Sequence, residues 1–172
     1  IEKKLNISRQ IKSKDSLKLL TESSELYREN IKTKIIAITG SCGKTTLKEL
    51  LGNSLKQIST VSVSPKSYNN KYGVPLSLFN LDQRNDYGVL EIGMDKKGEI
   101  DFLSKIVKPD VSVITNINYA HAKNFNNIKQ IALAKSEIIY NTKINEDVVL
   151  NDDDNFYNLH KKIANKRKLR IL

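Results

Sequence analysis

Hydrophobic residues along the chain form short runs that alternate between two spacings. Runs rich in β-branched residues, which are typical of buried strands, occupy residues 35–39, 60–63, 87–92, 111–115, 148–150 and 169–172. Between them, apolar residues with helical spacing occupy residues 45–57, 74–79, 99–107, 128–140 and 155–164. Strands that alternate with helices form parallel sheets through right-handed crossovers. The pattern therefore predicts an α/β fold, a mostly parallel sheet with helices on both faces.

The residues before this series are mostly polar and contain one periodic stretch. Four leucines, at positions 17, 19, 20 and 26, follow Asp15, a residue type that often caps the first turn of a helix. We expect residues 1–30 to form a linker and a first helix, and residues 31–172 to form the main domain. The chain starts at Ile1 and stops at Leu172, directly after a predicted strand, which we interpret as a piece of a longer protein.

The composition is that of a globular domain. The chain has 172 residues, of which 39% are hydrophobic and 28% are charged. No apolar run approaches the ~20 residues of a membrane span. The single cysteine, Cys42, cannot form an internal disulfide, which is typical of a reducing compartment. We therefore expect a cytoplasmic protein without a membrane span.

The net charge of +10 is unevenly distributed. The last twelve residues contain six basic residues and no acidic one, which leaves +4 for the rest of the chain. No aromatic residues alternate with these cations in the way that single-stranded nucleic acids require. We therefore expect no nucleic acid as a partner. The basic residues are Lys161, Lys162, Lys166, Arg167, Lys168 and Arg170.

A glycine-rich loop lies between the first predicted strand and the helix that follows it. Its glycines allow backbone N–H groups to point inward, where they and the positive end of a helix bind phosphate. Lys44 would reach the β- and γ-phosphates of a nucleotide, and Thr45 would place its hydroxyl on Mg²⁺. The strict phosphate-loop pattern requires a glycine where this chain has Ile38, so a glycine-rich turn with an unrelated lysine is the alternative. The expected nucleotide contacts are Thr39, Gly40, Ser41, Cys42, Gly43, Lys44, Thr45 and Thr46.

Two further side chains follow predicted strands at the edge of the sheet where ligands gather. Glu91 ends an apolar strand, and because an isolated buried carboxylate is costly, we expect it to bind a cation. A carboxylate turned to solvent is the alternative. His121 lies just beyond residues 111–115 and could equally be a loop residue without a role. The spacing alone places Lys135 and His160 on solvent-exposed helix surfaces.

These residues resemble the Mur ligases, the ATP-dependent amide-forming enzymes of bacterial cell-wall synthesis. The resemblance covers residues 15–155 and is strongest to the branch that joins D-alanyl-D-alanine to a UDP-N-acetylmuramoyl tripeptide. Five short segments carry it through their order and spacing. They are residues 38–46 with Lys48 and Glu49, Asn69 and Asn70 with residues 73–76, residues 91–93 with 98–100, residues 116–121, and residues 134–138.

The resemblance implies a reaction and a set of roles. ATP would phosphorylate the substrate carboxylate, and the amine of the dipeptide would then attack the acyl phosphate. Lys44, His121 and Lys135 would be catalytic, and Asn69 and Asn70 would contact substrate. The metal ligands would be Thr45 and Glu91 for one Mg²⁺, with His121 and a carbamylated Lys135 for a second.

The resemblance also implies that parts of the enzyme lie outside this chain. Residues 31–172 would be an incomplete ATP-binding central domain, without the amino-terminal domain for the UDP sugar and the carboxyl-terminal domain that delivers the amine. The chain departs from the family at Lys123, where an acidic residue is frequent, and at Asn124, where glycine is common. Two alternatives remain open: another Mur-type or folylpolyglutamate-type ligase, or a non-catalytic module that binds a nucleotide or a nucleic acid.

Overall fold

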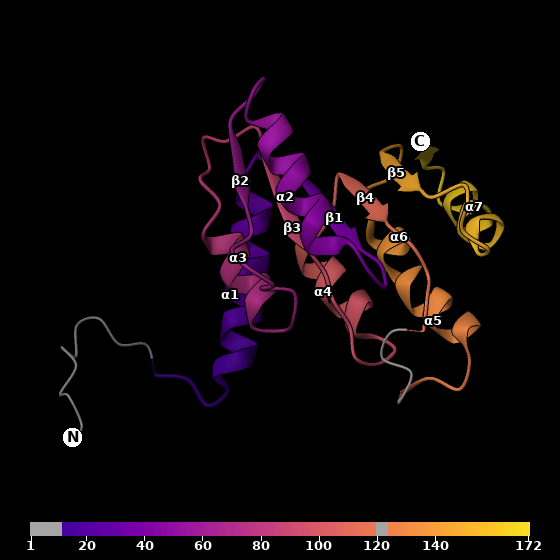
Figure 1. The fold of residues 1–172 in the computed structure, drawn as a ribbon. Helices are drawn as coiled ribbons and strands as arrows, with labels where there is room; N and C mark the ends of the chain where they lie inside the picture. Colours follow the sequence, from indigo (N-terminus) through magenta and orange to yellow (C-terminus); the bar gives the residue numbers. More distant parts are fainter. Residues whose placement is uncertain (1–11, 120–123) are drawn as a thin grey trace.

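The chain folds around a parallel sheet. In the computed structural model, which describes residues 12–119 and 124–172, the sheet has six strands in the order β2-β3-β1-β4-β5-β6 (Figure 1). Every neighbouring pair among these strands is parallel, which confirms the predicted sheet. The strands are β1 (Lys34–Thr39), β2 (Val61–Val63), β3 (Tyr87–Glu91), β4 (Val111–Ile114), β5 (Asp147–Leu150) and β6 (Arg170–Ile171).

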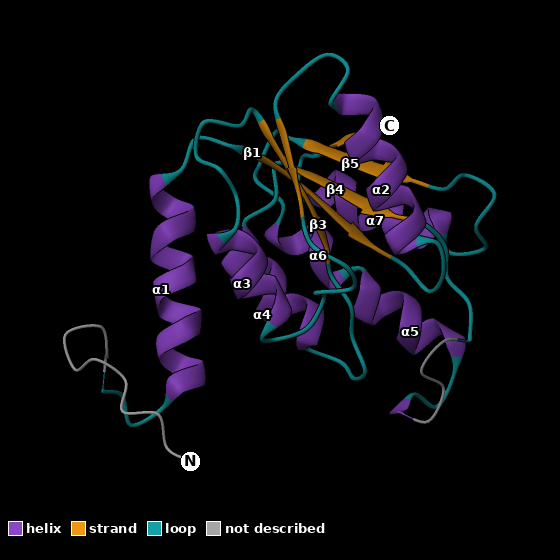
Figure 2. Cartoon of the chain, turned by 60° about the vertical axis from the view of Figure 1, so that its left-hand side comes forward, coloured by secondary structure: helices purple, strands orange, loops and turns teal. Residues whose placement is uncertain are grey.

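Helices cover both faces of this sheet, as the hydrophobic pattern predicts. On one face, Ile36, Ile38 and Val89 pack against leucines of α2. On the other face a larger core joins the sheet to α3, α4, α5, α6 and α7 (Figure 2). The helices are α1 (Ser16–Asn30), α2 (Lys44–Leu55), α3 (Gly73–Phe79), α4 (Glu99–Val107), α5 (Ile128–Lys135), α6 (Glu137–Asn141) and α7 (Tyr157–Lys166).

Helix α1 begins at the predicted cap and packs against this larger core. The Asp15 carboxylate accepts a hydrogen bond of 2.9 Å from the Lys18 N–H. Near the other end of α1, the Tyr27 hydroxyl donates to the Leu81 carbonyl at 2.9 Å, and its ring lies 5.5 Å from that of Phe79. These contacts fix α1 beside α3 (Figure 2).

The helix predicted over residues 128–140 is in fact two helices that meet at Ser136. The Ser136 hydroxyl donates to the Leu133 carbonyl at 2.7 Å, a local bond that competes with the helical ladder. The next turn is tighter, because the Ile139 N–H bonds the Ser136 carbonyl three residues back. The break separates Lys135 from Glu137, and both side chains matter for the site described below.

His160 is buried, which corrects the prediction that it lies on the surface. It is 2% exposed and belongs to the same face of α7 as Ile163 and Ala164, which pack on the core. Its Nε2 lies 3.2 Å from the Ala132 carbonyl, and burial lowers the pKa of the imidazole. The apolar stripe of α7 includes this position, but the surrounding lysines conceal it in the sequence.

The register of the central strands brings their carboxyl ends together. Ile38 of β1 pairs with Glu91 of β3, and Thr39 pairs with Ile114 of β4. The loops that follow β1, β3 and β4 therefore leave the sheet at one edge, the position where parallel sheets bind ligands.

Candidate active site at the carboxyl edge of the sheet

The loop between β1 and α2 depends on two glycines. Gly40 has φ +148°, and a Cβ there would lie 1.8 Å from Thr115 Oγ1. Gly43 has φ +78° and is the residue from which α2 starts. No other residue type fits at Gly40, and one at Gly43 would be strained. The sequence Thr-Gly-Ser-Cys-Gly therefore folds into a turn that presents the amino end of α2.

The segment after β4 holds this loop in place. The Ser41 N–H donates to the Asn116 carbonyl at 2.9 Å, and the Cys42 N–H donates to the Asn116 side chain at 3.1 Å. The Ser41 hydroxyl accepts from the Asn118 N–H at 2.8 Å. Since these loop amides are bonded within the protein, a bound phosphate would have to rely on the first turn of α2, whose N–H groups have no partner inside the helix.

Two lysine amines meet on one carbonyl oxygen of the loop. Lys44 Nζ and Lys135 Nζ each lie 2.9 Å from the Gly40 oxygen. Lys135 is 2% exposed, so the prediction that this helical lysine is solvated was wrong. Burial lowers the pKa of Lys135 to about 7, and repulsion from Lys44 adds to the effect, while Cys42 opposes it. The loop thus has an excess of positive charge that is incompletely compensated in the protein itself.

A carboxylate, a hydroxyl and an amide converge beside this loop. Glu91, which is 2% exposed, accepts from the Thr45 hydroxyl at 2.7 Å through one oxygen. Its other oxygen accepts from the Asn69 amide, also at 2.7 Å. The alternative of a strand-end glutamate turned to solvent is therefore excluded. Carboxylate and hydroxyl oxygens are ligands that Mg²⁺ prefers, so Thr45 and Glu91 fit a magnesium ion that also binds phosphates.

A cavity of about 670 Å³ opens next to these groups. Lys44, Asn69 and Asn70 line it on the side of the phosphate loop. The Asn70 side chain accepts from the Gly73 N–H at 2.9 Å and so fixes the turn into α3. Residues 93–99, together with Phe102 of α4, also line it. The cavity has room for a substrate next to the phosphate loop.

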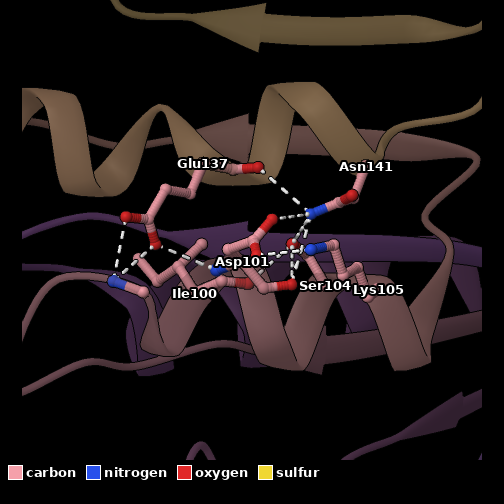
Figure 3. Close-up of polar contacts among 7 residues, drawn as sticks. Ile100, Asp101, Ser104, Lys105, Glu137 and Asn141 are labelled. Atoms are coloured by element: carbon pink, nitrogen blue, oxygen red, sulfur yellow. Dashed lines mark hydrogen bonds and ion pairs between the residues drawn. The ribbon is translucent and has the colours of Figure 1, made fainter.

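Glu137 of α6 bonds the start of α4, where residues 98 and 99 line the cavity. Its carboxylate accepts from the Gly98 N–H and the Asp101 N–H, each at 2.9 Å, and so caps the first turn of α4 (Figure 3). Burial raises the pKa of Glu137, and the two amide bonds oppose that shift. The Asn141 side chain donates to Asp101 Oδ1 at 3.0 Å and to Ser104 Oγ at 2.9 Å from the next turn (Figure 3).

Lys135 and Glu137 therefore contact different parts of the site. The amine reaches the phosphate loop and the carboxylate reaches the wall of the cavity. The sequence gives no signal for the role of Glu137, because a carboxylate that caps a distant helix has no fixed spacing from it. It lies, however, within the segment 134–138 on which the family resemblance rests.

The remaining predicted residues are placed as follows. Thr39 is buried, and within the described ranges its hydroxyl has no hydrogen-bond partner. The Cys42 thiol is free and exposed, and Thr46 is exposed. His121 lies outside the described residues. In the part of the chain that the structure describes, no group of three His, Cys, Asp or Glu side chains could hold a metal ion.

Lys48 is a buried residue whose place the sequence analysis did not anticipate. It lies on α2 and is 0% exposed. The sequence contained a signal for this burial: Lys48 borders the apolar stripe formed by Leu47, Leu51 and Leu55, which packs on the sheet.

None of the helices in residues 12–119 and 124–172 combines the length and apolar content needed to span a bilayer.

Comparison with known proteins gives one consistent result. The family model described as "Mur ligase middle domain" matches residues 38–172. A UDP-N-acetylmuramoyl-tripeptide–D-alanyl-D-alanine ligase of Buchnera aphidicola is 41% identical over 135 residues, which are 78% of this chain and 30% of that protein. The ligase of the same name from Rickettsia prowazekii is 39% identical over 156 residues, 87% of this chain and 35% of its own length. The chain thus spans about a third of the curated relatives it matches.

Solved structures of such ligases have the same fold. MurF from Acinetobacter baumannii superposes with a TM-score of 0.87 at 34% identity, over 96% of this chain and 38% of that one. MurF from Thermotoga maritima, solved in complex with ADP, gives 0.84 at 34% identity, over 99% of this chain and 39% of its own. FolC of E. coli, at 0.70 and 16% identity over 95% of this chain and 47% of its own, shares the fold alone.

Proposed function

Since this chain belongs to the Mur ligase family through its middle domain, we propose that it forms the ATP- and Mg²⁺-binding part of an amide-forming ligase. The reaction would join D-alanyl-D-alanine to a UDP-N-acetylmuramoyl tripeptide through an acyl phosphate. The similarity to ligases of that name supports this substrate pair, and the MurF structure with ADP supports the nucleotide. The FolC-like alternative has less support, because that resemblance is limited to the fold.

The observation that carries the proposal is the pair of amines on the Gly40 carbonyl beside the Thr45–Glu91 pair. Phosphoryl transfer to a carboxylate brings two anions together, and their repulsion is large where water is excluded. Lys44 and the amino end of α2 would offset that charge and hold the γ-phosphate. Mg²⁺ held by Thr45 and Glu91 would supply further positive charge at the phosphates.

Lys135 would contribute in a second form. A pKa near 7 leaves a large fraction of its amine neutral at physiological pH, and a neutral amine is the form that reacts with carbon dioxide. Carbamylation would replace a surplus cation with a carboxylate, which together with His121 could hold a second Mg²⁺. Asn69 and Asn70 would contact the substrate in the cavity that they line.

The same comparison supports the domain arrangement that we propose, because the chain covers only about a third of its relatives. Residues 1–30 would link to an amino-terminal domain for the UDP sugar, and residues 31–172 would be the incomplete central domain. A further carboxyl-terminal domain of the same enzyme would deliver the amine. We place the enzyme in the cytoplasm, where its nucleotide substrates are made.

The test is turnover by the full-length protein with a panel of amine substrates. We expect phosphate release with the UDP-muramoyl tripeptide and D-alanyl-D-alanine, but not with single amino acids or a folate acceptor. Lys44→Ala should lower kcat/KM about 1,000-fold, the loss typical of removing a group that stabilises the transition state. Lys56→Ala is the matched control, because Lys56 is exposed at the other end of α2. Equal turnover by wild type and Lys44→Ala would contradict the proposed site.

A further inference from the structure

Lys48 is a buried charge for which the proposed reaction has no use. It lies on the second turn of α2, after Lys44 and Thr45, and its side chain is fully buried. Burying an ammonium group is costly unless hydrogen bonds and an opposite charge compensate it. An apolar residue would fill the same space without this cost. The contacts of the amine should therefore show what a lysine contributes at this position.

Those contacts connect α2 to the segment that follows β2. Lys48 Nζ donates to the Ser64 carbonyl at 2.8 Å and to the Lys66 carbonyl, and it forms an ion pair of 3.1 Å with Glu49. Lys66 has φ +47°, a conformation that a residue with a side chain rarely adopts. The amine of Lys48 thus holds a segment whose backbone does not favour its own conformation.

The same segment reaches Glu91 at two points. The Ser64 hydroxyl accepts from the Glu91 N–H at 3.4 Å, and the Asn69 side chain donates to the Glu91 carboxylate at 2.7 Å. The backbone of Asn69 also accepts from the Gly93 N–H at 2.8 Å. Residues 64–69 therefore contact the Glu91 backbone through Ser64 and the Glu91 carboxylate through Asn69, and Lys48 fixes the start of this segment.

We propose that Lys48 is a positioning residue of the magnesium site: by holding the Ser64 and Lys66 carbonyls against α2, it keeps Asn69 on Glu91 and the carboxylate directed at Thr45. Thr45 and Lys48 lie three residues apart on one helix, so α2 holds the carboxylate directly through one side chain and indirectly through the other. This inference rests on the proposed function, because it assigns Lys48 to the metal of that site. Lys44 and the amino end of α2 do not depend on residues 64–69, so metal-free nucleotide binding should not depend on Lys48.

The experiment compares ATP binding by the full-length protein with and without Mg²⁺, using calorimetry in EDTA and at increasing magnesium concentrations. In Lys48→Met the two carbonyls lose their donor, and we expect the gain in affinity from Mg²⁺ to fall about tenfold while affinity in EDTA is unchanged. Lys48→Arg keeps a cationic donor and should restore most of that gain. Lys56→Met, at the exposed lysine that directly follows this helix, should bind as wild type.

A double-mutant cycle keeps the inference testable if Lys48→Met folds poorly. Asn69→Ala removes the amide that donates to the Glu91 carboxylate and leaves the contacts of Lys48 intact, so it should show the same magnesium deficit. If Lys48 acts through Asn69, the double variant will be no worse than either single variant. Equal losses with and without Mg²⁺ in Lys48→Met, wild-type binding by it, or additive losses in the double variant would each overturn the inference. Wild-type ATP binding that ignores Mg²⁺ would instead overturn the proposed function itself, and this inference with it.

Discussion

Charged side chains are buried at both ends of the parallel strands, the amino edge and the carboxyl edge of the sheet. The groups that compensate these charges differ between the two edges. At the amino edge, Arg28 of α1 pairs with Asp110 at 2.8 Å, and Lys143 pairs with the other oxygen of Asp110 at 2.5 Å. The Arg28 guanidinium also donates to the Val107 carbonyl at 2.7 Å. Asp110 in turn accepts from the Ile35 N–H at 2.8 Å, which ties the cluster to β1.

At the carboxyl edge, Lys44, Lys135 and Glu91 do not form such ion pairs. Lys44 and Lys135 share a neutral carbonyl oxygen, and Glu91 accepts from a hydroxyl and an amide. A buried charge with an opposite charge in contact holds a fold together, whereas a buried charge bonded only to neutral groups is suited to an ionic ligand. The comparison therefore separates a structural cluster from a candidate active site within one sheet.

The largest expected effect is a loss of folding stability when the charge cluster at the amino edge is broken. Arg28→Met leaves Asp110 buried with one of its two cations removed, and we expect the free energy of unfolding to fall by about 3–5 kcal/mol, as for other broken buried pairs. Urea unfolding of the full-length protein measures this loss. ATP affinity per folded molecule should stay at the wild-type value, because the cluster lies away from the phosphate loop.

The control for this prediction is an exposed pair of the same chemistry. Arg84 contacts Asp82 at 2.7 Å, but the arginine side chain is 87% exposed. Arg84→Met should change the unfolding free energy little, since solvent screens such pairs. A small effect of Arg28→Met, similar to that of Arg84→Met, would show that the amino-edge cluster does not hold the fold together.

The second prediction concerns the buried amine of Lys135 and how it makes the free energy of unfolding depend on pH. The pKa of Lys135 is about 7 in the fold and ordinarily 10.5, so the unfolded chain binds more protons between these values. The free energy of unfolding should therefore rise with pH across this window. In Lys135→Met that contribution is absent, so the variant should gain about 2 kcal/mol less than wild type between about pH 7.5 and pH 9.5. Denaturant unfolding at the two pH values gives the difference.

Lys56→Met is the control here as well, because an exposed lysine should leave the pH dependence unchanged. A wild-type pH profile in Lys135→Met would mean that burial and the neighbouring Lys44 do not lower the pKa of this amine. The carboxyl edge would then not contain the poorly compensated charge that distinguishes it from the amino edge.

The fold could be predicted from the sequence because its main signals are local. The β-branched runs, the glycines of the loop and the Asp15 cap each act within a few residues, and the resulting strands confirm the pattern. The break at Ser136 was missed because a single hydroxyl bond decides it. The residues of the glycine-rich loop were selected for the same local reason, and the roles assigned to them and to His121 remain predictions.

The burial of charged residues could not be predicted in this way. Lys48 and His160 border apolar stripes of their helices, but the burial of these two residues and of Lys135 also depends on carbonyl groups far away in the sequence. Spacing shows which face of a helix a residue occupies, but not whether a distant loop supplies an acceptor. The family resemblance made Lys135 a candidate site residue although its spacing did not, because a match to a family motif does not depend on whether the residue is buried.

The smallest expected effect tests the cavity wall. In Glu137→Gln an NH2 group replaces one of the two acceptor oxygens and faces a backbone N–H at the start of α4, which should cost about 1 kcal/mol of unfolding free energy at neutral pH. Burial raises the pKa of Glu137 above its ordinary 4.5, so the fold binds this proton more tightly than the unfolded chain. As the pH falls through that window, wild type should gain stability relative to the variant.

Denaturant unfolding at several pH values measures this gain, and Glu22→Gln, an exposed glutamate of α1, is the control. Because Glu137 supports residues 98–101 and not the Glu91 carboxylate, its variant should raise the KM of the substrate in the cavity and leave magnesium-dependent ATP binding intact. Loss of that binding in Glu137→Gln would mean that the wall and the phosphate loop move as one unit. The carboxyl edge would then contain a single coupled site, in which Lys135 and Glu137 act together across the break at Ser136.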